Sequence, residues 1–299
     1  MSGKLEYDII KGYSANVKHE WARLSKVTGL MEYITTVHYL DRYMPKKGAV
    51  ADIGSGPGRY SVLLASRGYN VIAVDPVEKN IEALAAKFRS KGVSKRLIGT
   101  HVGFAQNLSM LDDESFDVTV CLGGPMSHIM NPRQRKKAAE ELIRITKSGG
   151  MIFASVMGRL TLFNGTVRAF NSDLDSDYIM NWAKSGDYGG GYGFLPFHGF
   201  RPDELEGLFG SSVKILAKTA LEGFASYSGK SIAKLSKNKR RWDRWLKIHF
   251  SISEEPETIG VSEHYMLVMK KNGKSNPLMS QVIRVFCAMG ELDLQWTDY

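Results

Sequence analysis

The sequence predicts an α/β protein in which seven strands form a doubly wound, mostly parallel sheet with a helical and loop cap. Short apolar runs alternate with helical patterns from Val50 to Lys270, which is typical of strands joined by crossover helices. A glycine-rich turn, DIGSGPG, follows the first apolar run, where a sheet of this type binds its ligands. With 299 residues, of which 43% are hydrophobic, the chain can bury a full core without disulfides or structural metal.

The strands are expected where the apolar runs lie. They are residues 49–54, 70–75, 96–103, 116–123, 151–156, 213–218 and 263–270. Helices are expected between these runs and ahead of the first one. They cover residues 8–44, 59–68, 76–92 and 131–150, with Pro76 as a start signal and Gly68, Gly92 and the pair Gly149–Gly150 as stop signals.

The remaining segments predict a division into a main domain, a cap and a tail. Residues 1–44 are expected to form an N-terminal helical cap, and residues 45–270 the main domain. Residues 157–200, rich in glycine and aromatic residues, and the basic residues 224–250 are expected to be cap insertions within it. Residues 271–299 form a C-terminal extension whose role, like the oligomeric state, the sequence leaves open.

Cysteine usage and hydropathy predict a cytoplasmic protein. Cys121 and Cys287 have no zinc-like spacing and suggest no disulfide framework. The first residues lack the pattern of a signal peptide, and the longest apolar run of the tail carries Arg284, so no membrane association is expected. The net charge of +9 and the pI near 9.3 are compatible with nucleic acid, an anionic cosubstrate or simple solubility.

The glycine turn discriminates between two classes of cofactor. A dinucleotide fingerprint requires a third glycine where this chain has Arg59, which argues against an NAD-dependent oxidoreductase. An acidic residue followed by alternate glycines is satisfied completely, by Asp52, Gly54, Gly56 and Gly58. Asp75 ends the next strand, where a carboxylate can accept hydrogen bonds from two ribose hydroxyls.

Together with two later segments, these residues resemble class I S-adenosylmethionine-dependent methyltransferases, of the small-molecule kind similar to methyltransferase types 11 and 25. DDESFDVTVCLGG resembles the fourth-strand segment of that family, and ITKSGGMIFASV resembles the segment that enters its fifth strand. The resemblance covers residues 50–156 and implies a Rossmann-like fold. It also implies an enzyme that transfers a methyl group from S-adenosyl-L-methionine to a small-molecule acceptor and releases S-adenosyl-L-homocysteine.

The resemblance also implies which residues hold the cofactor. The three glycines would form the floor under its methionine part, Asp52 would orient the loop, and Asp75 would hold the ribose. Where many relatives carry an acidic residue after the third strand, this chain has Phe104, so the adenine contact is left to stacking on Phe104 or to nearby amides. The expected cofactor site comprises Tyr13, Trp21, Asp52, Gly54, Gly56, Gly58, Asp75, Pro76, Phe104, Ala105, Cys121 and Leu122. For the N-terminal candidates, which include His19 and Arg23, packing of an amphipathic helix is an equally good explanation.

Methyl transfer from a sulfonium is a direct displacement, so alignment supplies much of the rate and a base is needed only if the acceptor must lose a proton. His128 follows the fourth strand, where the family's acceptor meets the methyl group, and is a candidate catalytic residue. Packing on the following loop is the alternative role for His128. His198, at the end of the first cap insertion, is a second candidate base or substrate contact. No cluster of ligands implies a metal.

Two further features have both a functional and a structural explanation. Tyr188, Tyr192 and Phe194 would form an aromatic lid or belong to a plain loop, and Arg201 would bind an acidic substrate or pair with a neighbouring acid.

Residues 229–249 carry eight Lys or Arg against one Asp, together with Trp242 and Trp245. This pattern fits a nucleic-acid surface, and so an RNA or protein methyltransferase or a non-catalytic binding module. It also fits a solvated basic helix that packs its tryptophans on the sheet, the interpretation that we favour.

Overall fold

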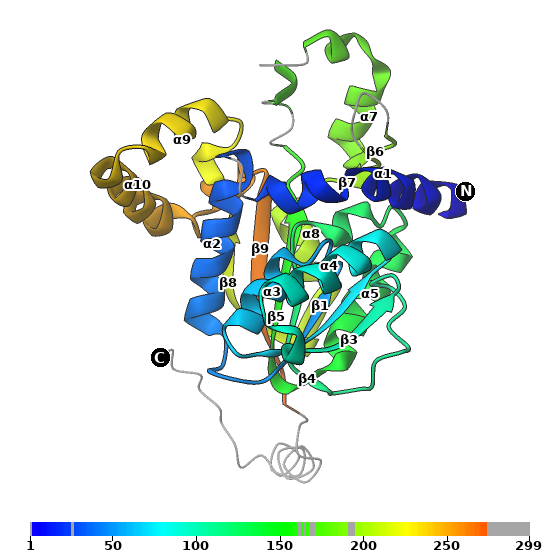
Figure 1. Cartoon of the computed structure of the whole chain (residues 1–299). Coiled ribbons are helices and arrows are strands. Elements are labelled where there is room, and N and C mark those ends of the chain that lie inside the picture. The colour runs from blue at the N-terminus through cyan, green and yellow to red at the C-terminus, as the bar shows by residue number, and fades with distance from the viewer. Residues whose placement is uncertain are drawn as a thin grey trace, which may run out of the picture.

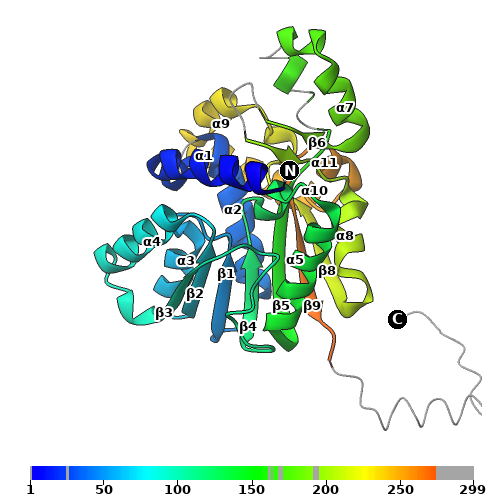
Figure 2. The ribbon, with the colours of Figure 1, turned by 90° about the vertical axis from the view of Figure 1, so that its right-hand side faces the viewer.

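The computed structural model describes residues 2–24, 27–160, 163, 165–167, 171–190 and 195–273. Their centre is a seven-stranded sheet with the order β3-β2-β1-β4-β5-β9-β8 (Figures 1 and 2). The strands are β1 Ala49–Ile53, β2 Asn70–Asp75, β3 Leu97–Val102, β4 Phe116–Cys121, β5 Thr146–Met157, β8 Val213–Ala220 and β9 His264–Lys271. All seven predicted strands are confirmed. A separate two-stranded sheet pairs β6 (Asp187–Tyr188) with β7 (Phe197–His198).

The sheet is parallel from β3 through β5, and β9 then runs antiparallel to both of its neighbours. The chain reverses its order of winding at β1 and β4, which lie side by side with Val50 opposite Val118. In sheets of this kind the crevice outside the carboxyl ends of two such strands is where ligands bind. The structure therefore confirms the doubly wound fold and indicates one edge of the sheet as the place to look for a site.

Helices cover both faces of the sheet. Those that pack their apolar side chains on one face are α2 Val27–Tyr43, α3 Arg59–Ser66 and α4 Glu78–Ser90. Those on the other face are α5 Pro132–Ile145, α8 Pro202–Phe209 and α11 Pro256–Gly260. Five short 3-10 turns complete this described part of the chain: η1 Ser94–Arg96, η2 Pro125–His128, η3 Asn171–Asp175, η4 Gly210–Ser212 and η5 Gly223–Ala225.

One predicted boundary is wrong. The helix expected over 131–150 ends at Ile145, and β5 begins at Thr146, so that Gly149 and Gly150 lie inside the strand instead of ending the helix. The pairing of β4 with β5 explains this, because its register shifts between Phe116 and Val118. Gly149 has a positive φ of 75°, and a Cβ on Gly150 would lie 2.9 Å from the carbonyl oxygen of Asp117. The two glycines thus allow an irregularity in the strand.

The cap segments surround the carboxyl edge of the sheet. Helix α1 (Ser2–Arg23) crosses this edge and has non-helical backbone angles at Asn16 (Figures 1 and 2). Helices α7 (Asp177–Ser185), α9 (Gly229–Ser236) and α10 (Lys239–Ile252) follow later in the chain. The division into cap and main domain stays a prediction. In the part of the chain that the structure describes, no helix has the length and apolar composition needed to cross a bilayer.

The tryptophans of α10 pack differently from expectation. Trp242 and Trp245 lie partly buried in an apolar cluster with Met31 of α2 and Ile232 of α9, and not on the sheet. The prediction that these tryptophans pack on the sheet was wrong, because α9 and α10 contact each other and lie beside α2 (Figure 1). Of the C-terminal extension, everything from residue 274 onward, including Cys287, lies outside the described residues.

Candidate functional site

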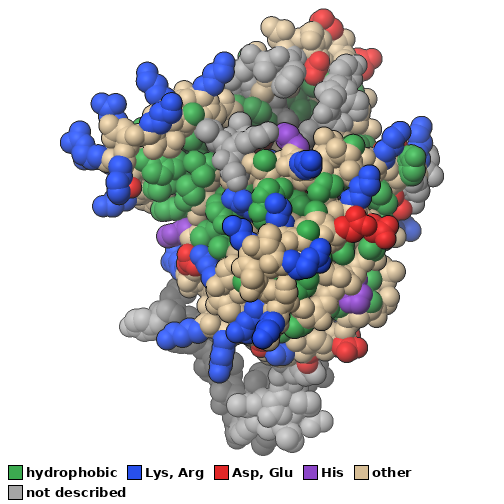
Figure 3. Space-filling view, viewed as in Figure 1, with side chains coloured by type: hydrophobic (Ala, Val, Ile, Leu, Met, Phe, Trp, Pro, Cys, Tyr) green, Lys and Arg blue, Asp and Glu red, His purple; other side chains and the backbone are tan. Residues whose placement is uncertain are grey.

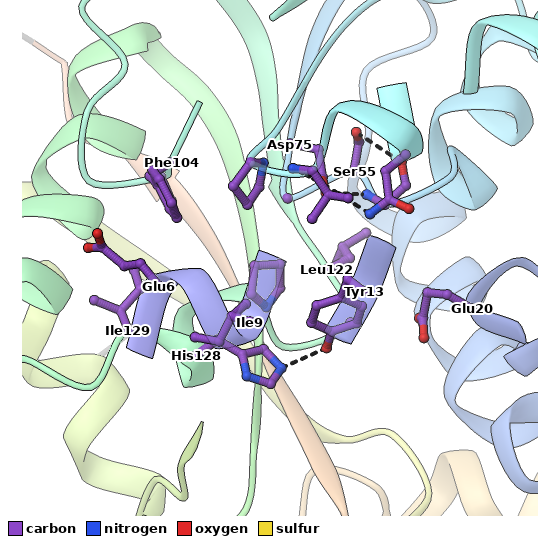
Figure 4. A pocket seen from close by; sticks show the side chains of 18 of the residues that line it. Glu6, Ile9, Tyr13, Glu20, Ser55, Asp75, Phe104, Leu122, His128 and Ile129 are labelled. Atoms are coloured by element: carbon purple, nitrogen blue, oxygen red, sulfur yellow. Dashed lines mark hydrogen bonds between the residues drawn. The ribbon is translucent and has the colours of Figure 1, made fainter. Parts of the chain in front are cut away.

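A cavity of about 480 Å³ lies at the carboxyl edge of the sheet, under α1 (Figure 4). Its walls come from the glycine turn after β1, the end of β2, the loop after β3, the segment after β4, and α1. It therefore lies at the crevice that the strand order indicates. The expected site residues that line it are Tyr13, Gly54, Gly56, Asp75, Pro76, Phe104, Ala105, Leu122 and His128.

The glycine turn exposes its main chain, without side chains, to the cavity. Gly54 N–H donates to the carbonyl oxygen of Val74 at 2.8 Å, which folds the turn back over β2. Gly56 lines the cavity with a positive φ of 52°, and a Cβ there would meet nothing within 4 Å. Gly54 is glycine for a different reason, since a Cβ on it would lie 2.4 Å from the ring of Pro125. A ligand can thus approach the main chain at Gly56.

Asp75 joins the glycine turn to the start of α4. One carboxylate oxygen accepts from Gly56 N–H at 2.7 Å, and the other accepts from Val77 N–H at 2.9 Å and from Asn80 Nδ2 at 3.0 Å. Burial raises the pKa of Asp75, which is only 4% exposed, although these three hydrogen bonds favour its charged form. The side chain therefore connects the glycine turn to the start of α4 and also faces the cavity.

Two polar atoms beside Asp75 fit a ligand that donates hydrogen bonds. Asn80 and Gln106 line the cavity, and each has a buried side-chain oxygen without a hydrogen-bond partner among the described residues. A buried acceptor without a donor is costly, so such atoms usually meet a ligand or water. The hydroxyl and amino groups of a nucleoside are donors of this kind. The empty space at Gly56 and these two oxygens together fit a nucleoside cofactor.

Four expected cofactor residues lie outside the described lining of the cavity. Asp52 is buried and accepts a hydrogen bond from Ser61 Oγ at 2.5 Å, and burial raises its pKa to about 7. Cys121 is fully buried in the core, where burial raises the pKa of its thiol to about 12. Gly58 and Trp21 are the other two residues outside the lining. A Cβ on Gly58 would collide with the side chain of Leu84, and the guanidinium of Arg59 lies over the ring of Trp21. These four residues therefore lie behind the residues that line the cavity.

Tyr13, which was expected to hold the cofactor, forms a hydrogen-bonded pair with His128 at the cavity (Figure 4). His128 Nδ1 lies 2.8 Å from the carbonyl oxygen of Pro196, which can only accept, so Nδ1 carries the proton. Its Nε2 is then a free acceptor, and Tyr13 OH donates to it at 2.7 Å. Burial lowers the pKa of His128 and raises that of Tyr13, so both are neutral near pH 7.

The structure places His198 away from the described cavity lining. Its Nδ1 lies 2.6 Å from Asp187 Oδ1, and its Nε2 lies 3.7 Å from a carboxylate oxygen of Glu204. The ring is only 4% exposed and packs edge-on against Phe200. These contacts connect the small sheet to α8.

Two further candidates, Tyr188 and Arg201, also lie outside the described cavity lining. Arg201 donates its backbone N–H to Glu204, and Tyr188 is buried beside Tyr178 and Phe197. Tyr192 and Phe194 lie outside the described residues.

Arg23 lines the cavity and belongs to a set of charges that the sequence alone did not reveal. Its Nε donates to Glu20 at 2.8 Å, while Nη1 and Nη2 both donate to the buried Glu32, the latter at 3.2 Å. Glu222 and His264 lie close to Glu32, from segments far along the chain. Glu32 had one detectable signal, since a lone carboxylate among apolar residues of a helix usually has a buried partner.

Comparison with known proteins agrees with the fold and the site. A family model described as "Methyltransferase domain" matches residues 50–150. The ubiquinone biosynthesis O-methyltransferase of Rickettsia felis is 26% identical over 178 residues, which cover 56% of this chain and 66% of that protein. The glycine/sarcosine N-methyltransferase of Parasynechococcus marenigrum is 28% identical over 113 residues, or 37% of this chain and 39% of that protein. The chain therefore spans less than two thirds of the length of either relative.

A solved structure has a similar fold. A SAM-dependent methyltransferase from Methanosarcina mazei superposes with a TM-score of 0.56 at 19% identity, over 79% of this chain and 98% of that one. The matched fold, the family segment and the nucleoside-sized cavity define a Rossmann-like methyltransferase domain. Residues 50–150 therefore form a domain of the S-adenosylmethionine-dependent methyltransferase family, whose cofactor is S-adenosylmethionine.

Proposed function

We propose that this protein transfers the methyl group of S-adenosylmethionine to a small-molecule acceptor. The observation that carries the proposal is that one cavity joins the glycine turn and Asp75 to the Tyr13–His128 pair. At about 480 Å³ the cavity has the size of an ordinary small-molecule site. Cofactor and acceptor would therefore meet in one cavity.

On the cofactor side of the cavity, the residues would bind and orient S-adenosylmethionine. S-adenosylmethionine supplies, when bound, a methyl group that is already activated on a sulfonium. Asp75 would accept hydrogen bonds from the ribose hydroxyls, and the oxygens of Asn80 and Gln106 would accept from other donors of the nucleoside. The backbone at Gly56 would allow close approach, and Phe104 and Pro76 would border the adenine ring.

On the acceptor side, the residues move a proton. Tyr13 would accept the proton of an acceptor hydroxyl or amine while it gives its own proton to His128 Nε2. The resulting imidazolium keeps its Nδ1–H bond to the Pro196 carbonyl, so the ring does not have to turn. Because His128 is neutral near pH 7, it is in the correct form to act as the base.

The names of the relatives support a small acceptor without choosing the attacking atom. One is named as an O-methyltransferase of ubiquinone biosynthesis and the other as an N-methyltransferase of glycine or sarcosine. Direct displacement with a shared proton path serves both oxygen and nitrogen. A cytoplasmic location is part of this proposal, supported by the free, buried thiol of Cys121.

The alternative of an RNA or protein substrate, or of a non-catalytic binding module, has one observation in its favour. Lys and Arg side chains of α9 and α10 project into solvent, as Figure 3 shows at the upper left. However, none of the described lining residues comes from these helices, and Trp242 and Trp245 are packed on α2 and α9 instead of free to stack on bases. We therefore prefer the small-molecule acceptor.

Calorimetric titration of the protein with S-adenosylmethionine, S-adenosylhomocysteine and NAD tests the first half of this proposal. We expect binding of both sulfur nucleosides and none of NAD. Transfer of labelled methyl groups to pools of small metabolites, compared with total RNA, tests the second half. Labelling of RNA alone would contradict the preferred acceptor, and binding of NAD alone would contradict the cofactor.

A further inference from the structure

We infer that His264, Glu222 and Glu32 form a buried charged network that positions Arg23 at the cavity, where Arg23 binds the carboxylate of the cofactor's methionine part. This inference rests on the proposed function. It adds three positioning residues, from α2, the β8–β9 connection and the start of β9. None of them is among the described lining residues, so they would act through Arg23.

His264 and Glu222 are held together by several hydrogen bonds. His264 Nδ1 lies 2.9 Å from Glu222 Oε1, and the backbone N–H of His264 donates to Glu222 Oε2 at 2.7 Å. Ser262 Oγ also donates to Glu222 Oε2, at 3.1 Å. The relative exposures are 8% for His264, 2% for Glu222 and 1% for Glu32. One ligand atom from each of these three side chains lies within 4.8 Å of those of the other two.

Glu32 connects this pair to the cavity through Arg23. Both of its carboxylate oxygens accept from the guanidinium, which lies over Gly123 at the end of β4. A Cβ on Gly123 would be 3.3 Å from Arg23 Nη2, so glycine leaves room for this approach. The guanidinium of Arg23 donates three hydrogen bonds to Glu20 and Glu32, which leaves some of its N–H groups unused. Arg23 also lines the cavity. The remaining donors suit an anionic oxygen of a bound ligand.

The network balances its charges only when His264 is protonated. Burial opposes the charged form of His264, but Glu222 and then Glu32 stabilise it, and the pKa of His264 is raised to about 9. The pKa of Glu32 is lowered by Arg23 and His264 in spite of burial. The two buried carboxylates, Glu32 and Glu222, are thus faced by one guanidinium and one imidazolium, and the partly exposed Glu20 also pairs with the guanidinium.

Two other titratable groups face His264. Burial, together with Glu222, raises the pKa of Glu263 to about 7. His128, the last residue of η2, has a pKa lowered by burial and is neutral near pH 7, so it adds no competing charge.

The same three residues have the composition of a metal site, but their contacts favour the proton instead. Both oxygens of Glu32 are bonded to Arg23, and Glu222 Oε2 already accepts two hydrogen bonds. A cation would have to displace Arg23 and remove the proton of His264. Added zinc or magnesium should therefore leave ligand binding unchanged.

Loss of the His264 proton should make the position of Arg23, which is bonded to Glu32, less well fixed. Glu32 and Glu222 would then face each other with only Arg23 to neutralise them. Because the folded pKa of His264 lies above its ordinary value, its stabilisation is complete below about pH 6.5 and disappears as the pH rises through about 9. Binding of a ligand with a carboxylate should decline over the same interval.

Calorimetric binding of S-adenosylhomocysteine to the full chain at about pH 7.5 and about pH 9.5 tests the inference. We expect His264→Gln to bind about tenfold more weakly than wild type at the lower pH and within about twofold of it at the higher pH. The ratio of affinities is compared because the amino group of the ligand titrates equally for every variant. His101→Gln, a histidine of β3 outside the described cavity lining, should match wild type at both pH values.

The choice of ligand and a second variant sharpen this test. 5′-Methylthioadenosine lacks the carboxylate and should bind wild type and His264→Gln equally. If His264→Gln does not fold, Glu222→Gln removes one partner of the imidazolium and should move the decline in affinity to lower pH. A wild-type to variant ratio that is the same at both pH values, or an equal effect on 5′-methylthioadenosine, would overturn the inference. If wild type bound neither nucleoside, the proposed function itself would fall.

Discussion

The two sides of the cavity, which we propose to hold the cofactor and the methyl acceptor, differ in how the chain forms them. On the cofactor side, the glycine turn, Asp75 and Asn80 lie close together in the sequence and are joined by hydrogen bonds over at most 19 positions. On the acceptor side, Tyr13 bonds to His128 across 115 positions. The cofactor side thus depends on local backbone geometry, whereas the acceptor side depends on how α1 packs over the sheet.

This difference predicts how each side responds to mutation. A change on the cofactor side should alter binding of the nucleoside whatever the acceptor. A change on the acceptor side should alter turnover and leave nucleoside binding nearly intact. Four predictions test this separation.

His128→Gln should have the largest effect, a fall in kcat of about 100-fold or more, because the proton acceptor is lost. The affinity for S-adenosylhomocysteine should stay within about twofold of wild type. In wild type, burial lowers the pKa of His128, so kcat should be constant near neutral pH and fall only below the ordinary range of histidine. Stopped assays across pH measure both effects. A normal kcat in this variant would remove His128 from the proton path.

Asp75→Ala should weaken binding of S-adenosylmethionine roughly 100-fold, because two hydrogen bonds to a charged acceptor are lost. Calorimetry measures the affinity, and circular dichroism checks that the variant is folded. Asp112→Ala, an exposed aspartate outside the described lining, is the matched control. Unchanged affinity in the Asp75 variant would mean that this carboxylate only connects the glycine turn to the start of α4.

Tyr13→Phe should lower kcat about tenfold and leave nucleoside affinity near that of wild type. The ring keeps its edge-on contact with His128, at 5.4 Å between centroids, while the hydroxyl that carries the proton is removed. A loss of nucleoside affinity as large as that of Asp75→Ala would show that Tyr13 itself belongs to the cofactor side, and the separation of the two sides would fail at this residue.

Charge reversal of Lys239, Arg240 and Arg241 to Glu should have the smallest effect on methylation of a small molecule, within about twofold. All three side chains are exposed on α10, which contributes no residue to the described lining of the cavity. The measurement compares labelling of small metabolites and of RNA by both proteins. Loss of RNA labelling alone would reveal a nucleic-acid substrate.

The sequence predicts the cofactor side better than the acceptor side for the same physical reason. Alternating glycines after an apolar run, and an acid at the end of the next one, are local patterns with local causes, and both reach the cavity. His128 could be chosen as a candidate because it lies in the segment after the fourth strand, between β4 and α5. The interpretation of His198 as a base missed Asp187 and Glu204, which only the folded chain brings to both ring nitrogens.

The buried network could not be predicted because each member has an ordinary position in the sequence. Glu32 lies in a helical segment, Glu222 in a connection, and His264 at the start of a predicted strand. Their partners lie on other elements, so no spacing relates them. The helix end at Ile145 was missed for a similar reason, since the bulge opposite Phe116 depends on how two strands pair.

The antiparallel direction of β9 has a consequence for where chemistry can arise in such a sheet. Because Met157, at the end of β5, pairs with His264, at the start of β9, a reversed strand delivers its first residue to the edge that its parallel neighbours reach with their last. A segment that leads into an antiparallel strand can therefore supply functional side chains to this edge, as a segment that follows a parallel strand does. A search confined to the loops after strands overlooks them.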